Sequence, residues 1–321
     1  MTSLYRDMEM PLTDSHLVVS NSNLKIIIWN AQISSARSAV DQRNWRISKR
    51  FISSMIFQEI DFIGIVEIDE NSVAYLNSIF TRFNLPYRVA NGTQKRGNTR
   101  FDTCIIYRSD KFALILTPNN QDCENTDSSY KGEFSKSGQK YDFWDLNNQE
   151  MLSFVLVHWP SILTPEIHKV REKVAQNLRF HLDNWLSKNS NIIITGDFNT
   201  EPYCTSLTED LCSFREPKSP SRSKNGFELL YNPSWNLLNV PPPLSIPLPY
   251  PALGTYFYKQ KNYQHWFNFD QVMFAKNLIE GESGWKYAEN SLKILNIFDL
   301  TNQKERWSDH LPIQFNLTWR S

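Results

Sequence analysis

The sequence predicts a four-layer α/β sandwich, in which two packed, mainly antiparallel sheets are flanked by helices. Two observations lead to this fold class. Short apolar runs rich in β-branched residues recur along the chain, and a few longer stretches between them carry apolar residues at helical spacing. The order is strand–helix–strand–helix, then strands, then helix–strand, then strands, which suits two stacked sheets with helices outside. With 321 residues, the chain can bury a large core.

Each predicted strand is a short apolar run bounded by Gly, Pro, Asn, Asp or Ser. These strands are residues 24–29, 62–67, 103–107, 112–116, 152–158, 191–197, 269–275, 292–298 and 313–318. Three predicted helices each carry one apolar face, because their apolar residues recur mostly every three to five positions. These helices are residues 46–60, 71–83 and 165–186.

No internal repeat and no flexible linker divides the chain. We therefore expect one domain over residues 24–321, preceded by an N-terminal extension, residues 1–23. Residues 92–100 and 119–139 are polar and predict loops. Residues 200–266 are long and irregular, and they contain the run PPPLSIPLPYP. We interpret that run as a semi-rigid surface loop, with a PxxP ligand for an SH3-like partner as the alternative.

Charge and composition narrow the class of protein. Lys plus Arg equals Asp plus Glu at 34 each, whereas a polybasic nucleic-acid binder carries a positive excess. A nuclease is not excluded, since a small basic rim and a metal ion suffice. The four cysteines form no C-x-x-C pair and have no His at zinc-finger spacing, which indicates buried thiols in a reducing compartment. We find no signal peptide and no membrane-length apolar run, so we predict a cytoplasmic protein without a membrane segment.

The strongest motif is IITGDFNTEP, residues 193–202. A β-branched run ends at Gly196, and Asp197 and Asn199 follow two residues apart. On an extended backbone that spacing places both side chains on the same side, at the rim of the sheet. An isolated Asp-x-Asn after a strand is usually a turn. The full GDFN sequence followed by Pro is much more specific.

Five other strand boundaries carry polar residues. Asn30 ends KIIIWN, Glu67 ends FIGIVE, His158 follows VLV, Asp270 opens DQVMFA, and Asp309–His310 precede the last strand in SDHLPI. Each alone is typical of a strand meeting solvent or of a polar turn. An acid at the start of a buried strand is costly unless paired, so we expect a partner such as His310 for Asp270. Together, at one mouth of a sandwich, these residues would surround a hard cation with oxygens and add two imidazoles.

The order WN, E, H, GDFN, D and SDH resembles the endonuclease/exonuclease/phosphatase superfamily, the DNase I-like proteins, over roughly residues 25–318. Two segments, YNPSWNLL and GTYFY, resemble those of uncharacterised bacterial members. Val66 departs from the family pattern, which often has Gln before the acid. His158 is expected in DNase I-like nucleases and in lipid or inositol phosphatases, but not in exonuclease III-like repair enzymes, which argues against abasic-site repair.

The resemblance implies metal-dependent hydrolysis of phosphate esters by in-line attack of water. Glu67, helped by Asn30, would bind Mg²⁺, with Mn²⁺ as a substitute. Asp309 would help to hold the metal or the Asp–His pair. The family therefore implies a hard-metal site at these strand ends.

The resemblance also implies the catalytic roles. Asp197 would orient or deprotonate the attacking water, and Asn199 would hydrogen-bond the phosphoryl oxygens. His158 would stabilise the growing negative charge, and Asp270 would orient His310. A dianionic transition state requires such positive charge and preorganised donors.

Nucleic acid is the leading substrate prediction. The basic loop that includes Lys95, Arg96 and Arg100, together with the Trp/Tyr-rich insertion, could contact backbone and bases. A solvated turn is an equally weighted interpretation of that loop. The alternative enzyme is a phosphatase or phosphodiesterase on a small-molecule or lipid phosphate, of the inositol phosphatase or sphingomyelinase kind, which net neutrality favours. A binding module with a decayed site would have lost some of the eight site positions, and none is lost.

Overall fold

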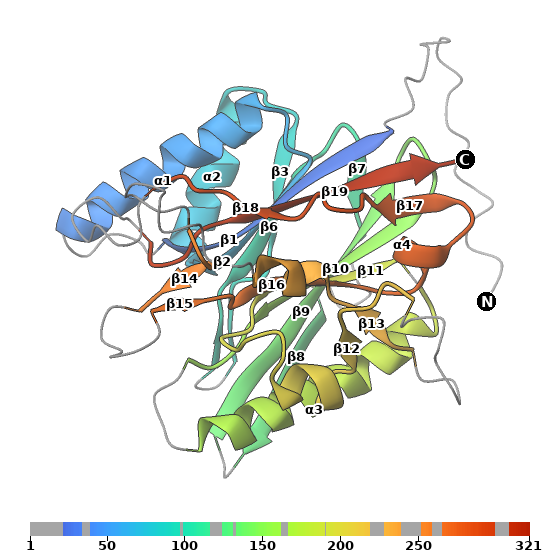
Figure 1. Cartoon of the computed structure of the whole chain (residues 1–321). Helices are drawn as coiled ribbons and strands as arrows, with labels where there is room; N and C mark the ends of the chain where they lie inside the picture. The colour runs from blue at the N-terminus through green and yellow to red at the C-terminus, as the bar shows by residue number, and fades with distance from the viewer. Residues whose placement is uncertain are drawn as a thin grey trace, which may run out of the picture.

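The structure is a computed structural model that describes residues 22–33, 39–96, 99–115, 124–130, 133–161, 166–189, 191–218, 228–238, 252–258, 265–298 and 308–321. In these residues two sheets pack face to face, and helices cover their outer faces (Figure 1). The predicted sandwich is confirmed. Almost all of the predicted N-terminal extension and the whole Pro-rich run lie outside the described residues, so the predicted domain division stays a prediction.

The first sheet has the strand order β17-β19-β1-β2-β6-β3, with β18 paired to β19. Its strands are β1 (Asn23–Ile33), β2 (Phe62–Ile68), β3 (Tyr87–Asn91), β6 (Thr103–Arg108), β17 (Gly284–Tyr287), β18 (Lys293–Ile294) and β19 (Ile313–Arg320). Strands β1 and β2 are parallel, and α1 (Ala39–Phe57) connects them. The other pairs in this sheet are antiparallel.

The second sheet has the order β12-β13-β16-β11-β10-β9-β7, with β8 paired to β9. Its strands are β7 (Phe112–Leu114), β8 (Glu124–Tyr130), β9 (Glu133–Asp145), β10 (Met151–His158), β11 (Ile192–Asp197), β12 (Ser213–Phe214), β13 (Leu230–Tyr231) and β16 (Asp270–Phe274). Strands β10 and β11 are parallel, and α3 (Ile167–Leu186) connects them. Each sheet thus contains one strand–helix–strand crossover at its centre.

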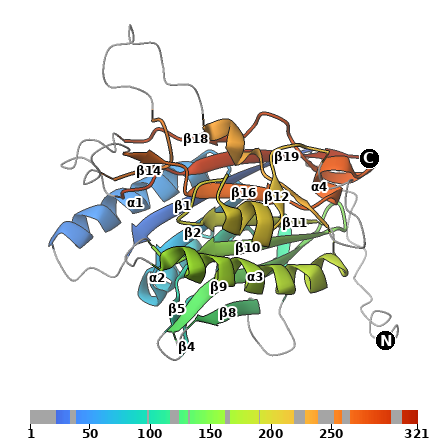
Figure 2. The ribbon, with the colours of Figure 1, turned by 60° about the horizontal axis from the view of Figure 1, so that its bottom comes forward.

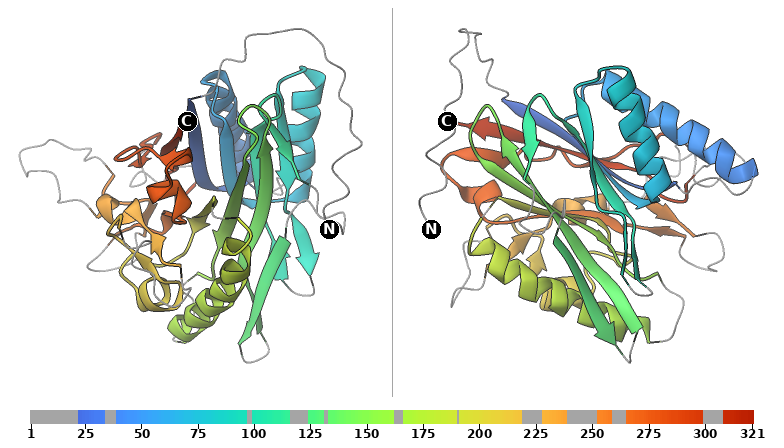
Figure 3. Two further views of the ribbon diagram at one scale, coloured as in Figure 1. Left: turned by 90° about the vertical axis from the view of Figure 1, so that its right-hand side faces the viewer. Right: turned by 180° about the vertical axis from the view of Figure 1, so that it is seen from behind.

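Helices α1 and α2 (Glu70–Arg82) cover the first sheet, and α3 covers the second (Figures 2 and 3). The remaining elements are short. They are α4 (Asn277–Glu280), a π-helical turn (Ser206–Asp210), a 3₁₀ turn (Pro233–Leu237), and two small antiparallel pairs, β4 (Gln94–Arg96) with β5 (Thr99–Phe101) and β14 (Tyr256–Phe257) with β15 (Trp266–Phe267).

Three clusters of buried side chains fill the three interfaces between the four layers. Strand β1 contributes side chains to two of these clusters. Ile26 and Ile28 pack between the sheets, whereas Ile27 and Trp29 pack beneath the helices of the outer layer. Side chains alternate between the two faces of a strand, so a strand buried on both faces must be apolar throughout.

Strand register brings the polar strand ends to one edge of the sandwich. His158, the last residue of β10, pairs with Asp197, the last residue of β11. Asp197 in turn pairs with Asp270, the first residue of β16. In the first sheet Asn30 of β1 pairs with Val66, next to Glu67. The fold therefore juxtaposes residues that are far apart in the sequence.

Two predicted loops are wrong. Residues 119–139 include β8 and the first half of β9, which form a long antiparallel pair, and residues 92–100 include β4 and part of β5. Both segments pair through the backbone without an alternating apolar pattern, which is the signal that predicts strands. The predicted strand 292–298 is also shorter than expected, since only Lys293–Ile294 pair with β19.

Cys104, Cys204 and Cys212 are free thiols, as their spacing predicted, and Cys123 lies outside the described residues. Among the described helices, none has the length and hydrophobicity needed to span a bilayer.

Candidate active site

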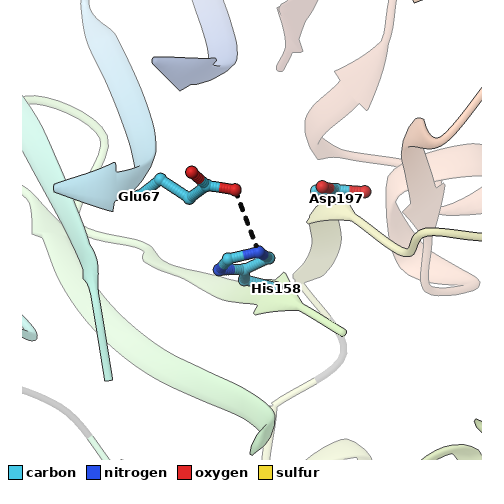
Figure 4. Close-up of side chains that lie close together, drawn as sticks. All are labelled: Glu67, His158 and Asp197. Carbon is cyan, nitrogen blue, oxygen red and sulfur yellow. Dashed lines mark ion pairs between the residues drawn. The ribbon is translucent and has the colours of Figure 1, made fainter. Parts of the chain in front are cut away.

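Glu67, His158 and Asp197 converge from the ends of β2, β10 and β11 (Figure 4). One potential ligand atom from each lies within 4.8 Å of the others. His158 Nε2 is 3.3 Å from Glu67 Oε1. Burial opposes ionisation of Glu67, but hydrogen bonds and charge from His158, together with Asn30, outweigh it and lower its pKa. The carboxylate is therefore charged at neutral pH.

Asn30 joins the two carboxylates. Its side-chain amide donates to Glu67 Oε1 at 2.9 Å and to Asp197 Oδ2 at 3.0 Å. Its Oδ1 is buried and has no hydrogen-bond partner among the described residues. A buried acceptor without a partner is costly, and its presence beside two carboxylates is typical of a site that holds a ligand.

These residues fit a hard divalent cation. Carboxylate and amide oxygens are the ligands that Mg²⁺ and Mn²⁺ prefer, and Glu67, Asp197 and Asn30 supply them. The amide of Asn30 can also turn about its terminal torsion, which would present the unpaired Oδ1 to the same space. His158 is a softer ligand, better suited to contact the substrate.

Asp197 and Asn199 are held by the turn that follows β11. The backbone N–H of Asn199 donates to Asp197 Oδ1 at 2.8 Å, and its side-chain amide donates to Asp197 Oδ2 at 3.1 Å and to the Trp159 carbonyl at 3.0 Å. Asn199 adopts a positive φ of 50°, and Glu67 one of 57°. Non-glycine residues rarely adopt that conformation, and it is concentrated at functional sites.

His310 and Asp270 form a buried pair. His310 Nδ1 is 2.7 Å from Asp270 Oδ2, and His310 Nε2 is 3.6 Å from Asp197 Oδ2. Burial works against the imidazolium, but Asp270 and then Asp197 outweigh it and raise the pKa of His310 to about 10. Burial raises the pKa of Asp197, and His310 opposes that rise. The pairing predicted from the sequence is therefore present.

His158 has an acid partner that sequence reasoning missed. Its Nδ1 lies 3.1 Å from Asp102 Oδ2, and Lys136 Nζ contacts both groups, at 3.0 Å from His158 Nδ1 and 2.5 Å from Asp102 Oδ1. Burial works against the imidazolium, but Asp102 raises the pKa of His158 to about 9. Burial likewise favours neutral Asp102, yet His158 and then Lys136 lower its pKa to about 2.

Asp102 carries a sequence signal that we did not use. It precedes the strand TCIIYR, just as Asp270 begins the strand DQVMF, and both follow Phe. The argument that identified Asp270, an acid at the start of a buried strand, applies equally to Asp102. Lys136 carries no such signal, since it lies in the polar segment that we predicted to be a loop.

The site opens into a cavity of about 540 Å³. Its lining combines a polar group and an aromatic group of side chains, named here the polar wall and the aromatic wall. The polar wall includes Glu67, His158, Asp197, Asn199, Asp309, His310, Gln32 and Ser161, and the aromatic wall consists of Tyr256, Tyr258, Phe267 and Phe269.

The aromatic wall lies directly against the catalytic residues. The Tyr256 ring is 4.7 Å from the His310 ring, and it stacks on Phe269 at 5.1 Å. Tyr256 also lies nearly parallel to Tyr258, whose side chain is 37% exposed. Tyr256 and Tyr258 belong to the Trp/Tyr-rich insertion that the sequence analysis connected with base contacts, but no individual aromatic residue was identified, because aromatic residues are also ordinary components of a core.

Three predicted groups are placed differently from the rest. Asp309 lines the cavity, with Oδ1 3.8 Å from His310 Nε2, but it is not part of the close group of Glu67, His158 and Asp197. Lys95 and Arg100 are exposed on β4 and β5 and do not line the cavity. The Arg96 side chain lies outside the described part of the structure.

Several solved structures are similar to this fold. An endonuclease/exonuclease/phosphatase family protein from Bacteroides thetaiotaomicron has 15% sequence identity and a TM-score of 0.60, covering 93% of this chain and 95% of its own. A mannosyl-6-phosphatase from the same organism has 14% identity and a TM-score of 0.58, over 92% and 100%. D. rerio TDP2, complexed with a single-strand DNA product, has 12% identity and a TM-score of 0.55, over 93% and 100%.

A comparison of the sequence with family models assigns the family. No curated protein sequence matches the chain. A family model described as "Endonuclease/Exonuclease/phosphatase family" matches residues 46–314. This match spans most of the chain and includes the GDFN and SDH motifs. The chain therefore belongs to the endonuclease/exonuclease/phosphatase family, whose members are metal-dependent phosphoesterases.

Proposed function

We propose that this chain is a Mg²⁺-dependent nuclease that hydrolyses nucleic-acid phosphodiesters. The observation that carries the proposal is the aromatic wall. Tyr256 and Tyr258 lie in the same cavity as Asp197, His158 and His310. Aromatic side chains stack on nucleobases, so a nucleotide next to the scissile phosphate has a surface to bind.

The polar wall suits in-line attack of water. Asp197 accepts a proton from the attacking water or orients it. Asn199, whose side-chain amide contacts Asp197 Oδ2 and the Trp159 carbonyl, would exchange its contact with Asp197 for a phosphoryl oxygen. His310, oriented by Asp270, donates to the phosphoryl group from the Asp197 side of the cavity. His158 donates to the phosphoryl group as well and stabilises the negative charge that develops in the transition state.

Glu67, Asn30 and Asp197 would hold the metal, with Asp309 at the cavity wall nearby. Mg²⁺ or Mn²⁺ bound there supplies positive charge to the phosphoryl oxygens. Glu67, in holding the cation, would give up its contact with His158 Nε2. The imidazole N–H of His158 would then be available to the substrate.

A phosphatase or phosphodiesterase on a small-molecule or lipid phosphate is the second candidate. One observation favours it: Lys95 and Arg100, which we expected to bind a nucleic-acid backbone, do not line the cavity. Similar folds occur in a mannosyl-6-phosphatase and in TDP2 complexed with DNA, so the fold is compatible with both substrates. A cytoplasmic location stays a prediction from the sequence.

A substrate panel tests the nuclease proposal. Purified protein with Mg²⁺ is assayed on single-stranded DNA, duplex DNA, RNA, inositol phosphates, sugar phosphates and bis-p-nitrophenyl phosphate. We expect hydrolysis of a nucleic acid, and we expect Tyr258→Ala to raise its KM about tenfold with little effect on bis-p-nitrophenyl phosphate, because the lost stacking is worth about 1–3 kcal/mol.

Tyr75→Ala is the matched control. Tyr75 is a similarly exposed tyrosine, at 41%, on α2, away from the cavity. It should leave both activities unchanged. Hydrolysis of inositol or sugar phosphates with no cleavage of any nucleic acid would contradict the nuclease proposal and support the second candidate, a phosphatase.

A further inference from the structure

The hairpin formed by β4 and β5 has one buried face and one exposed face. Phe101, at the end of β5, is 1% exposed, and Thr99 is also buried. The strand register pairs Lys95 of β4 directly with Arg100 of β5, and both of these side chains are exposed. Paired residues on a hairpin point to the same side of it, so the exposed face presents two cations next to each other.

No acid compensates these two cations. Residues 92–101 contain Lys95, Arg96 and Arg100 and no Asp or Glu. Neither Lys95 nor Arg100 forms an ion pair with any residue that the structure describes. Like charges directly opposite each other destabilise a hairpin, and a single Lys would be enough to protect the edge of so small a sheet. Two facing cations are therefore expected where the exposed face binds an anion, which would remove their repulsion.

The hairpin is anchored next to the candidate active site. At its root, Gln139 of β9 donates through Nε2 to the Gly92 carbonyl at 2.6 Å. Strand β5 lies against β9 (Figure 2). Arg100 is two residues from Asp102, whose carboxylate lies 3.1 Å from His158 Nδ1. The hairpin therefore lies beside the site, on the side of β9.

The aromatic wall lies on the other side of the site. The strand order of the second sheet includes β16-β11-β10-β9, and Asp270, Asp197 and His158 lie side by side at the ends of the first three strands. The aromatic wall belongs to the β16 end of this row, because the Tyr256 ring is 4.7 Å from His310, the partner of Asp270. Neighbouring strands are about 4.8 Å apart, so the three spacings from β16 to β9 separate the two features by about 14 Å.

A ligand that touches both features must be extended. A sugar phosphate or an inositol phosphate bound in the cavity is too short to do so. A nucleic-acid strand carries one phosphate about every 3.4 Å when its bases are stacked, so about four nucleotides cover this distance. Its bases can stack on the aromatic wall while its phosphates contact the cations of the hairpin.

We propose that the exposed face of the β4–β5 hairpin, with Lys95 and Arg100, binds the sugar-phosphate backbone of a nucleic-acid strand whose scissile phosphate lies in the cavity. This inference rests on the proposed nuclease function and goes further, because it predicts a substrate of several nucleotides. It also assigns a role to two cations that do not line the cavity. Phosphate contacts of this kind position a strand without reading its sequence.

Substrate length tests the inference. The variant Lys95→Gln/Arg100→Gln is assayed with Mg²⁺ on a single strand of about 20 nucleotides, on a dinucleotide and on bis-p-nitrophenyl phosphate, because only the long strand reaches the hairpin. We expect the ratio of kcat/KM for the long strand to that for the dinucleotide to fall about tenfold, mainly through a higher KM for the long strand.

Fluorescence anisotropy of a labelled strand gives a readout that does not depend on turnover. With EDTA in place of Mg²⁺, the slope of log affinity against log salt concentration should be smaller by about 1.4 in this variant, because each phosphate contact to a single strand contributes about 0.7. Lys95→Arg/Arg100→Lys retains both charges and should bind as the wild type does. Thermal unfolding of the Gln variant should show no loss of stability, since the repulsion between the two cations is removed.

Lys188→Gln/Arg320→Gln is the matched control, with the same change in net charge. Both side chains are exposed at the edge of the sandwich away from the site, Lys188 before the start of β11 and Arg320 at the end of β19. This control should leave the ratio of kcat/KM values and the salt slope unchanged.

Three outcomes would overturn the inference. They are unchanged binding and cleavage of the long strand in the hairpin variant, an equal loss in the control, and equal losses on the long strand, the dinucleotide and bis-p-nitrophenyl phosphate, which would mean that the hairpin only supports the site. Failure of the wild type to cleave any nucleic acid would instead contradict the proposed function. The anisotropy titration would then still decide whether the hairpin binds a strand.

Discussion

Buried ionisable residues gather at one edge of the sandwich, and each has a specific partner. Asp197, Asp270 and His310 are each at most 4% exposed. Charged groups are rarely buried unless they are paired, because desolvation disfavours the charged form. The pKa values of Asp197 and His310 are both raised, and groups with perturbed pKa values are concentrated at catalytic sites.

The Asp270–His310 pair predicts a specific pattern of mutant kinetics. Asp270→Asn should lower kcat by about 10²–10⁴ with little change in KM, because orientation of His310 matters mainly in the transition state. His310→Ala should be at least as damaging. Steady-state kinetics of the double variant should show little further loss, and additive losses would mean that Asp270 has a separate role.

Glu201 predicts a pH dependence of stability. Burial raises its pKa from 4.5 to about 7, and it is 6% exposed. The folded state therefore favours the neutral acid, and this contribution is present below pH 4.5 and is lost as the pH rises through about 7. Relative to Glu201→Gln, the free energy of unfolding of the wild type should fall by about 3 kcal/mol over that window. Urea titrations of both proteins at pH 4.5 and 8 measure this difference, and parallel pH profiles would contradict it.

At the residue scale, the sequence predicted those site residues that lie in recognisable motifs, and it missed those that lie outside them. Asp197, Asn199 and His310 lie in the GDFN and SDH segments. Lys136 reaches the site through pairing of β9 with its neighbours, a long-range contact that no local pattern records. The sequence linked the Trp/Tyr-rich insertion to base contacts but did not single out the residues of the aromatic wall, because stacking platforms and core aromatics have the same composition.

The strands position the site residues because these residues lie at the strand ends. Strands β10 and β11 are parallel neighbours, so their last residues, His158 and Asp197, lie side by side. Gly196 precedes Asp197 and has a φ of 133°, and a Cβ there would lie 2.2 Å from the carbonyl oxygen of Val157. The close approach of the two strands therefore requires glycine at this position.

Gly196→Ala should destabilise the protein and displace Asp197. The added methyl group meets backbone rather than a side chain that can move, and the backbone conformation is strained for alanine. We expect a loss of about 2–4 kcal/mol in the free energy of unfolding, measured by denaturant titration. Gly138→Ala is a milder control, since its nearest neighbours are side-chain atoms of Val155 and Leu178. Equal stability of the Gly196 variant and the wild type would refute the requirement.

The sequence predicted those elements whose apolar pattern matches their burial. Strand β1 is a continuous apolar run that is buried on both faces, and helix α3 buries the face that its periodicity reveals. Strand β8 pairs along β9 over a polar sequence, and the short pairs β4–β5 and β14–β15 contain few residues for any pattern. Backbone pairing across the sheet, rather than local preference, forms these elements.

Across the whole molecule, one hydrophobic cluster unites the two sheets. Ile28 and Phe62 of the first sheet pack with Phe154 and Val272 of the second. Separation of the sheets would expose this cluster to water, at a cost of about 25 cal/mol per Å² of apolar surface. The described part of the chain should therefore unfold as one unit.

Scanning calorimetry tests this cooperativity. We expect a single transition in which the calorimetric and van't Hoff enthalpies agree. The domain division predicted from the sequence requires the same result. Two separate transitions would mean that the sheets, or the segments outside the described residues, form independent units.

The central claim is that Glu67, Asn30 and Asp197 form a metal site that serves phosphate ester hydrolysis. The most direct measurement is the Mg²⁺ dependence of bis-p-nitrophenyl phosphate hydrolysis by the wild type and by Glu67→Gln. We predict a rate that saturates with Mg²⁺, disappears on chelation, and is lost in Glu67→Gln, because that change removes a charged oxygen ligand without altering its shape. Hydrolysis that survives chelation, or an unchanged Mg²⁺ dependence in Glu67→Gln, would contradict the claim.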